Sequence, residues 1–399
     1  MNRNKLFSII SSVFIFLTLI FIPVYIKAEE VTDETYGFSF DLPEEFFLDA
    51  STNDGLTHLF TSRKFPVNVI LKIYPGKEDS KKCLEETLEK LSAEHDISSF
   101  TWNEKPSAFS IFKMTVPGET ELSSGWALSC KIEKSNSVSV LLCYSKEKFI
   151  SESQCFFYSI LNSFKTDEND SITKGPLITF TFPEKEKLEV ETEIEGIKVK
   201  SFINEADIEA SKFAIDTEYN VLKYYAQSEK WKEAWIRYYK AIYRDTRGRI
   251  KTFTNDIYKV LYPISKQKNE KNMRYEINKM ILNWVQSFSY GREKDINGSD
   301  FSPIPQILQG AVSDCDSRSI LACAMLNQIG IESVLFISRE YSHAIYGANV
   351  KNAYPAENAR INIGEKSFLL CETTKKSLNP GLISKDMSDE NKWISVIFN

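Results

Sequence analysis

A cysteine, a histidine and an acidic residue in the last third of the chain have the types needed for nucleophilic catalysis. Cys315 stands in the sequence Gly310-Ala-Val-Ser-Asp-Cys315-Asp, and His343 and Glu372 follow it in that order. A thiol, an imidazole base and a carboxylate that orients the base form a catalytic triad when a fold brings them together. The three residues therefore predict attack on a carbonyl group by the thiolate of Cys315.

Local signals predict the helix that must carry the cysteine. Ser313 and Asp316 form an S-x-x-D capping box, and Gly330 is typical of the residue that follows a helix. Cys315 then lies in the first helical turn, where the helix dipole favours a thiolate. The carboxylates of Asp314 and Asp316 oppose this effect, so a nearby imidazolium is needed to keep the thiolate populated.

Apolar runs after this helix predict the strands that carry the other two residues. Residues 331–337 form one run, and His343 begins the next strand. Residues 367–374 form a third run, in which alternation places Glu372 on the face opposite Cys371. We expect Glu372 to accept a hydrogen bond from a ring nitrogen of His343, which would fix the tautomer of the base.

Further residues are alternatives or additions to this triad. Asn349 is a second candidate for the orienting group, whereas Asp314 and Asp316 are better explained as helix caps. The backbone N–H of Cys315 is one candidate donor to the oxyanion. The side-chain amide of Gln309, six residues upstream, is the other candidate, and the alternative is that Gln309 is only a polar loop residue.

Residues from about 280 to 374 resemble the transglutaminase-like (papain-like thiol) superfamily. The matching features are Trp284, Tyr290, Gly310, Cys315-Asp316, the segment Leu326-Asn-Gln-Ile-Gly330-Ile331, His343-Ala344 and Glu372-Thr373. The resemblance implies an α+β core, in which the helix of the cysteine packs on an antiparallel sheet that bears the histidine and the acid.

The chain departs from this family at three points. Many members have an aromatic residue two positions after the histidine, where this chain has Ile345. Many use aspartate as the acid, where this chain has Glu372. The gap of 29 residues between His343 and Glu372 is also longer than the family pattern leads us to expect.

The start of the chain predicts export. A short basic stretch, 1–5, precedes an uncharged apolar run from Leu6 to Ile26. The run is long enough to cross a bilayer, yet Pro23 and the small residue Ala28 fit a cleaved signal peptide. For residues 1–28 we favour a signal peptide over a retained membrane anchor. Both alternatives place the body of the protein outside the cytoplasm, in a periplasmic, cell-surface or secreted position.

Composition excludes several classes of protein. Hydrophobic residues make up 42% and aromatic residues 13% of the chain, which indicates well-packed cores and not a disordered chain. There are 49 basic and 55 acidic residues and no basic stripe, so we expect no nucleic acid as a partner. The transglutaminase-like resemblance implies a protein or peptide substrate. His58 and His95 lack metal-ligand spacing, and we expect no metal and no cofactor. No oligomeric state is predicted.

The chain has seven cysteines, an odd number, so they cannot all pair in disulfides within the chain. In an exported protein this indicates a free thiol. Cys315 and Cys323 lie on one predicted helix, about 12 Å apart, and cannot bridge each other. A bridge between Cys323 and Cys371 would leave Cys315 unpaired. The alternative is that all seven thiols are reduced and buried.

Residues 31–166 are predicted to form an α+β domain. Strands are expected at 36–43, 67–74, 108–116, 125–134 and 137–144, and helices at 81–95 and 152–164. The opening Tyr36-Gly-Phe-Ser-Phe-Asp-Leu-Pro43 and the closing Ile160-Leu-Asn-Ser-Phe164-Lys resemble the PsbP-like family of antiparallel sheets with helices. The polar and acidic segment 167–174 is predicted to be a linker.

Residues 175–399 are predicted to form the transglutaminase-like domain. Short strands are expected at 177–182, 188–192 and 198–202, and a helical region over 205–288 with breaks near Ser228, Gly248 and Pro263. The fold class of the whole chain is therefore α+β. An N-terminal antiparallel sheet with helices comes first, followed by a helical region and a transglutaminase-like α+β core.

Overall fold

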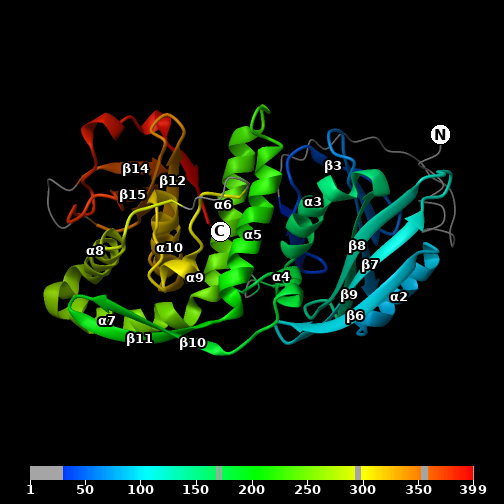
Figure 1. Ribbon diagram of the computed structural model, residues 1–399, viewed down its shortest axis with the longest axis horizontal. Helices are drawn as coiled ribbons and strands as arrows, with labels where there is room; N and C mark the ends of the chain where they lie inside the picture. Colours follow the sequence, from blue (N-terminus) through cyan, green and yellow to red (C-terminus); the bar gives the residue numbers. More distant parts are fainter. Residues whose placement is uncertain (1–29, 168–169, 171–172, 293–297, 352–357, 399) are drawn as a thin grey trace. The chain divides into compact units, whose positions relative to one another are not determined.

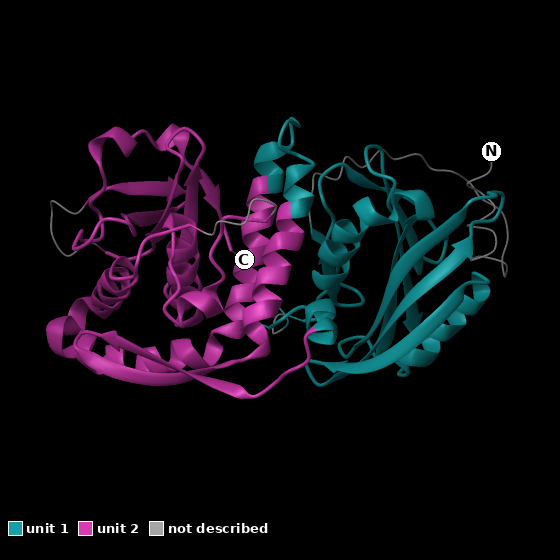
Figure 2. Cartoon of the chain, in the orientation of Figure 1, with its two compact units in different colours: residues 1–181, 220–234 teal, residues 182–219, 235–399 magenta. Residues whose placement is uncertain are grey.

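The structure, a computed structural model, describes residues 30–167, 170, 173–292, 298–351 and 358–398 (Figure 1). The chain divides into two compact units (Figure 2), of which unit 1 comprises residues 1–181 and 220–234, and unit 2 comprises residues 182–219 and 235–399. The apolar run from Leu6 to Ile26 lies outside the described residues. Within the part that is described, none of the helices has the length and apolar character that a membrane crossing requires.

Unit 1 is built on an antiparallel sheet of seven strands in the order β3-β4-β5-β9-β8-β7-β6. The strands are β3 (Phe46–Ser51), β4 (Thr57–Ser62), β5 (Asn68–Pro75), β6 (Glu94–Trp102), β7 (Lys105–Thr115), β8 (Leu122–Ile132) and β9 (Ser137–Lys146). A separate pair is formed by β1 (Glu30–Asp33) and β2 (Phe38–Asp41). The sheet confirms the predicted N-terminal half of an α+β fold.

Helices cover both faces of this sheet. Helix α2 (Ser80–Lys90) buries Cys83, Leu84 and Leu88 against alternate residues of β7 to β9. Helix α3 (Ile150–Asn162) follows the short 3-10 turn η1 (Glu147–Phe149) and lies on the other side of the sheet (Figure 1). Because successive strand residues point to opposite faces, a strand in a sheet with both faces covered is buried along nearly its whole length, as β9 is.

Most elements predicted in unit 1 are present, but two predictions are wrong. The predicted helix 81–95 ends at Lys90, because Ser92 adopts a left-handed φ of 53° and closes the helix, and β6 then begins. The predicted strand 177–182 is instead helix α4 (Pro176–Thr181), which starts on a proline and is capped by the side chain of Asn162. Strands β1, β3, β4 and β6 were not predicted.

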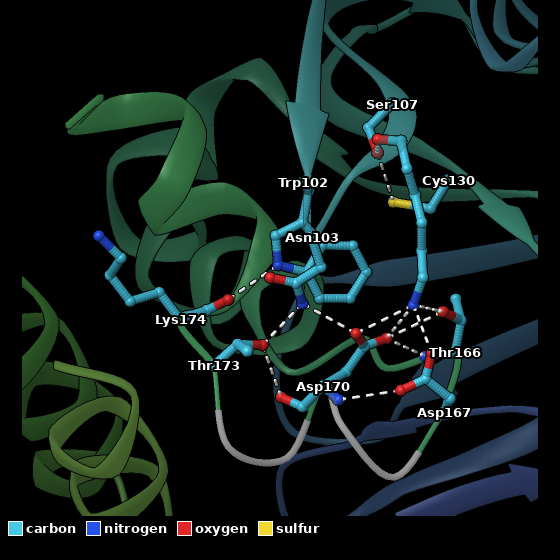
Figure 3. Close-up of polar contacts among 10 residues, drawn as sticks. Trp102, Asn103, Ser107, Cys130, Thr166, Asp167, Asp170, Thr173 and Lys174 are labelled. Atoms are coloured by element: carbon cyan, nitrogen blue, oxygen red, sulfur yellow. Dashed lines mark hydrogen bonds and ion pairs between the residues drawn. The ribbon is translucent and has the colours of Figure 1, made fainter. Parts of the chain in front are cut away.

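The described residues Asp167, Asp170 and Thr173 of the predicted linker belong to what we call the Lys105 cluster, with Asn103, Lys105 and Thr166. Figure 3 shows the polar contacts of this region. The ammonium of Lys105 donates to Thr166 Oγ1 at 2.6 Å, to Asp167 Oδ2 at 2.6 Å and to Asp170 Oδ1 at 3.0 Å. Asn103 adds bonds to Asp170 at 2.8 Å and to Thr173 at 2.6 Å. The compact unit accordingly continues beyond the predicted linker to Thr181.

Unit 2 combines a β-hairpin, a set of helices and a second antiparallel sheet. The hairpin pairs β10 (Lys187–Ile194) with β11 (Ile197–Asn204), and it confirms the strands predicted at 188–192 and 198–202. The helices are α5 (Ala206–Lys223), α6 (Trp231–Arg249), α7 (Lys251–Asn269), α8 (Met273–Gln286), α9 (Ile304–Ile307) and α10 (Cys315–Gln328), with a 3-10 turn η3 (Glu270–Asn272) between α7 and α8. The predicted helical region is thus present.

The predicted break at Pro263 is wrong, since this proline lies inside α7. A proline removes the hydrogen bond to the carbonyl four residues earlier, which here belongs to Lys259. The side chains of Pro263 and Lys259 lie on the exposed side of the helix, where water can satisfy that carbonyl.

The second sheet has the strand order β14-β15-β13-β12-β16. Its strands are β12 (Ser333–Ser338), β13 (His343–Ala348), β14 (Arg360–Ile363), β15 (Lys366–Cys371) and β16 (Ile394–Val396), and the 3-10 turns η4 (Lys385–Met387) and η5 (Glu390–Lys392) precede β16. Helix α10 packs on β12 and β13 and is buried over nearly all of its length. The helix that bears Cys315 and the strand that begins with His343 are therefore direct neighbours.

Candidate thiol site at the start of helix α10

Cys315 is the first residue of α10, as the sequence predicted, but the capping box is one residue later than predicted. The side chain of Asp314 accepts from the backbone N–H of Ser317 at 3.1 Å, and the Ser317 hydroxyl accepts from the N–H of Asp314 at 3.0 Å. Ser313 is unavailable as a cap because its backbone pairs with Ser289 and Gly291 in an extended bridge. At the other end, Gly330 follows the helix with a φ of 78°, as predicted.

His343 and Glu372 are joined by a hydrogen bond of 2.8 Å from His343 Nε2 to Glu372 Oε2. In the register of β13 and β15, Tyr346 pairs with Cys371. Continuing this register places Glu372 opposite Ile345, on the face that also carries His343. The carboxylate is 5% exposed, and its other oxygen accepts from the N–H and the hydroxyl of Thr374 at 2.8 and 2.7 Å.

The long gap between His343 and Glu372 has a structural explanation. The intervening chain contains β14, which pairs with β15 at the edge of the sheet. The additional residues thus extend the sheet by a strand on the far side of β15. They leave the pairing of β13 with β15, and so the meeting of histidine and acid, undisturbed.

Cys315 lies against the start of β13. The backbone of Ala344 lies near its sulfur and lowers the pKa of the thiol, so the thiol sits beside the residue that follows His343. Strand β15 ends opposite Tyr346, which leaves this stretch of the β13 edge to the cysteine. The structure thus joins His343 to Glu372 and places the backbone of Ala344, the residue after His343, beside Cys315.

A carboxylate also contacts the thiol. Cys315 Sγ donates to Asp316 Oδ1 at 3.5 Å, and the hydroxyl of Tyr239 donates to Asp316 Oδ2 at 2.5 Å. The cysteine is only 2% exposed. Burial, with the charges of Asp316 and Asp314 next in importance, raises the pKa of the Cys315 thiol well above its usual range. These effects outweigh the helix dipole, and the thiol is neutral at rest.

Asp314 itself is a weak acid in this setting. Burial, followed by repulsion from Asp316, raises the pKa of Asp314 to about 8. Its burial thus favours the neutral carboxyl form of Asp314. No feature of the sequence around Cys315 indicated Tyr239, which comes from α6 and holds Asp316 in place.

The remaining candidates lie apart from this arrangement. Gln309 is exposed, and its backbone N–H donates to the carbonyl of Gln306 at 3.0 Å, so its role at the oxyanion stays a prediction. The side chain of Asn349 donates to Glu332 Oε2 at 3.1 Å and is engaged away from His343. Sequence reasoning did not find the backbone of Ala344, because a backbone group has no signature in residue type.

Among the described residues, no group of three or more His, Cys, Asp or Glu side chains is placed to hold a metal ion. All seven cysteines have free thiols, and Cys155 alone among them is not fully buried. His58 bonds to Ser51 and to the Gly55 carbonyl, and His95 bonds to the Ala93 carbonyl, so both have local structural partners.

Comparison with known proteins finds no family model and no curated protein that matches the chain. Solved structures resemble it distantly. A cyanobacterial PsbP from Synechocystis is 10% identical over 36% of this chain and 95% of its own, with a TM-score of 0.30. The Ran-binding protein Mog1p of Saccharomyces cerevisiae is 10% identical over 35% of this chain and 96% of its own, with a TM-score of 0.27.

A third structure is LpqN of Mycobacterium tuberculosis, described as involved in cell envelope biogenesis. It is 14% identical over 34% of this chain and 88% of its own, with a TM-score of 0.26. About a third of the chain thus has a distant structural resemblance to PsbP-like, Mog1-like and LpqN-like α+β domains, and scores this low carry no further conclusion. None of the three supports the transglutaminase-like resemblance, which stays a prediction.

Replacing Asp316 with asparagine is expected to make Cys315 more reactive. The substitution removes the negative charge nearest the thiol, so the thiol pKa should fall and more thiolate should be present at pH 7. A fall of one pKa unit would raise the rate of alkylation by iodoacetamide roughly tenfold. The alkylation rate is measured by peptide mapping of Cys315 across a pH series. Asp386→Asn, at an exposed position, is the control. An unchanged titration midpoint would show that the thiol does not respond to Asp316.

Proposed function

We propose that this protein is an exported thiol enzyme that acts on peptide or glutamine-type amides through Cys315, His343 and Glu372. The observation that carries the proposal is the 2.8 Å bond between His343 Nε2 and Glu372 Oε2, in a site where the backbone of Ala344 lies near the cysteine sulfur. A carboxylate at Nε2 holds the ring proton on that nitrogen and leaves Nδ1 as the base. This division of roles is what a thiol nucleophile requires.

The reaction begins as the thiol proton of Cys315 passes to Nδ1 of His343 and the sulfur attacks the amide carbonyl. The resulting oxyanion is stabilised by backbone N–H groups at the start of α10. The imidazolium then protonates the leaving amine, and a thioester with Cys315 remains. Attack on the thioester by water gives a protease or amidase, whereas attack by a second amine gives an acyltransferase.

The electrostatics of the site favour a particular order of events. A buried thiol beside Asp316 is neutral at rest, so proton transfer accompanies the attack instead of preceding it. Glu372 remains ionised, because bonds from His343 and Thr374 outweigh the effect of burial and hold its pKa below the usual range. The carboxylate can therefore stabilise the imidazolium as it forms.

The proposed substrate is a protein or peptide outside the cytoplasm. The charge balance argues against nucleic acid. The basic start and apolar run of residues 1–28 support export, either with cleavage or with a retained anchor.

Two incubations of the mature protein test the proposal. One supplies a labelled primary amine with a glutamine-rich protein, and the other supplies peptides whose cleavage is followed by mass spectrometry. Activity in either assay should be lost in Cys315→Ala and kept in Cys155→Ser, which changes the most exposed of the other thiols. Activity that survives in Cys315→Ala would overturn the mechanism.

A non-catalytic binding or scaffold protein is the second candidate. The observation that favours it is the burial of Cys315 beside a carboxylate, which suppresses the thiolate. The discriminating measurement is the reactivity of Cys315 in the parent and in His343→Ala. Dependence of the alkylation rate on His343 supports the enzyme, and a rate that is the same in both supports the scaffold.

A further inference from the structure

Arg318 is a deeply buried arginine close to the site, and its exposed fraction is 1%. It lies in the first turns of α10, three residues after Cys315. Burying a cation is costly unless hydrogen bonds replace its hydration. The bonds that Arg318 makes therefore indicate its structural role.

The guanidinium of Arg318 holds together the three chain segments that surround the thiol. Its Nε donates to Ser313 Oγ at 2.8 Å, in the loop that leads to the cysteine. One terminal nitrogen donates to the carbonyl of Thr373 at 3.1 Å, directly after Glu372. The other donates to the carbonyl of Phe288 at 2.6 Å, at the end of α8. The three acceptors come from different parts of the sequence.

Two further contacts strengthen the links between these segments. The guanidinium lies over the ring of Tyr290, 5.3 Å from its centroid, and Tyr290 pairs with Ser313 through the extended bridge. The hydroxyl of Thr373 donates to the carbonyl of Cys315 at 3.4 Å. The residue after the acid is thus tied to the cysteine both directly and through Arg318.

We infer that Arg318 is a positioning residue for the proposed reaction, which sets the placement of the Glu372 and His343 pair relative to Cys315. The inference rests on the proposed function. Only a planar fork with several donors reaches three separate acceptors at once, and lysine presents the same charge at a single point. Charge and geometry can therefore be separated by substitution.

The test measures acylation of Cys315 by p-nitrophenyl acetate, in which the sulfur bonds to the acetyl carbon and p-nitrophenolate is released. Arg318→Lys should remain folded and keep the pH midpoint of Cys315 alkylation, because the charge remains. Its acylation rate should fall about 100-fold, since misplacement of reacting groups by about 1 Å has that effect. Arg318→Met, which also removes the charge, should move the alkylation midpoint to higher pH.

Arg249→Lys is the matched control. Arg249 is also a buried arginine of unit 2, and its bonds of 2.8 Å to Asp245 and 2.5 Å to Asp207 join α6 to α5. This variant is expected to lose stability and to keep the acylation rate per folded molecule. An equal fall in Arg249→Lys, or none in Arg318→Lys, would overturn the positioning role. A parent protein that p-nitrophenyl acetate does not acylate at Cys315 would overturn the proposed function, and this inference with it.

Discussion

Replacing Glu372 with glutamine is expected to lower the rate of Cys315 acylation by up to about four orders of magnitude. Glutamine keeps the size of the side chain and an oxygen that can accept the bonds from Thr374. Its amide then meets His343 Nε2 with N–H groups, so the ring proton must move to Nδ1. A histidine in that tautomer cannot accept the thiol proton. Release of p-nitrophenolate by the folded variant measures the loss.

Glu365→Gln is the control for this variant. Glu365 lies in the same β14–β15 hairpin and is exposed, so its loss should leave the rate unchanged. Full activity in Glu372→Gln would show that the acid is misassigned. Asn349 would then be the next position to test, although its side chain is bonded to Glu332 in the structure.

The Glu372→Gln variant also has a predicted dependence of stability on pH. The folded-state pKa of Glu372 lies below its usual value, so the carboxylate contributes stability above the unfolded-state pKa of about 4.3. This contribution is lost as the pH falls through the folded-state pKa. The difference in melting temperature between the parent and Glu372→Gln should therefore be largest near neutral pH and shrink in acid.

Replacing Lys105 with methionine is expected to destabilise unit 1 by about 3 to 5 kcal/mol. Asp170 is 3% exposed, and its carboxylate would lose the ammonium that neutralises it. Asp167 would lose the same partner, at 2.6 Å. Removal of one partner from a buried ion pair leaves an uncompensated charge, and that charge is the main source of the cost. Urea unfolding followed by tryptophan fluorescence measures the change.

Lys113→Met is the matched control because Lys113 lies on the same strand as Lys105. It forms an ion pair of 2.9 Å with Glu147, but these side chains are 49% and 46% exposed. Exposed pairs contribute little to stability, so Lys113→Met should be nearly neutral. Equal losses in the two variants would show that burial does not set the value of the Lys105 pair.

The parts of the site that local pattern determines were predicted, and the parts that depend on distant segments were not. Strand alternation placed Glu372 where it meets His343, because the two-residue period is preserved when strands pair. The capping box was misplaced by one residue. Both the Ser313 and the Asp314 versions fit the local pattern, and only the bridge of Ser313 to Tyr290 decides between them.

The same reasoning explains the misread segments of unit 1. Residues 167–174 have the composition of a linker, and their partner Lys105 lies more than 60 residues away in sequence. Strand β6 alternates weakly and lies at the edge of the sheet, where one-sided burial leaves little hydrophobic signal. Helix α4 has only six residues, and the side chain of Asn162 caps it from outside the local sequence.

The division of the chain into two units limits how the protein can be cut into fragments or recombined with other proteins. Residues 220–234 belong to unit 1 although unit 2 has already begun, so unit 1 is not one continuous piece of sequence. A fragment that ends at Thr181 would lack Tyr225, whose hydroxyl donates to the Glu44 carbonyl at 2.7 Å and whose ring packs on Phe65. Neither unit can therefore be transferred to another protein as one continuous stretch of sequence. A protease cut within 182–219 would leave part of unit 1 on each of the two fragments.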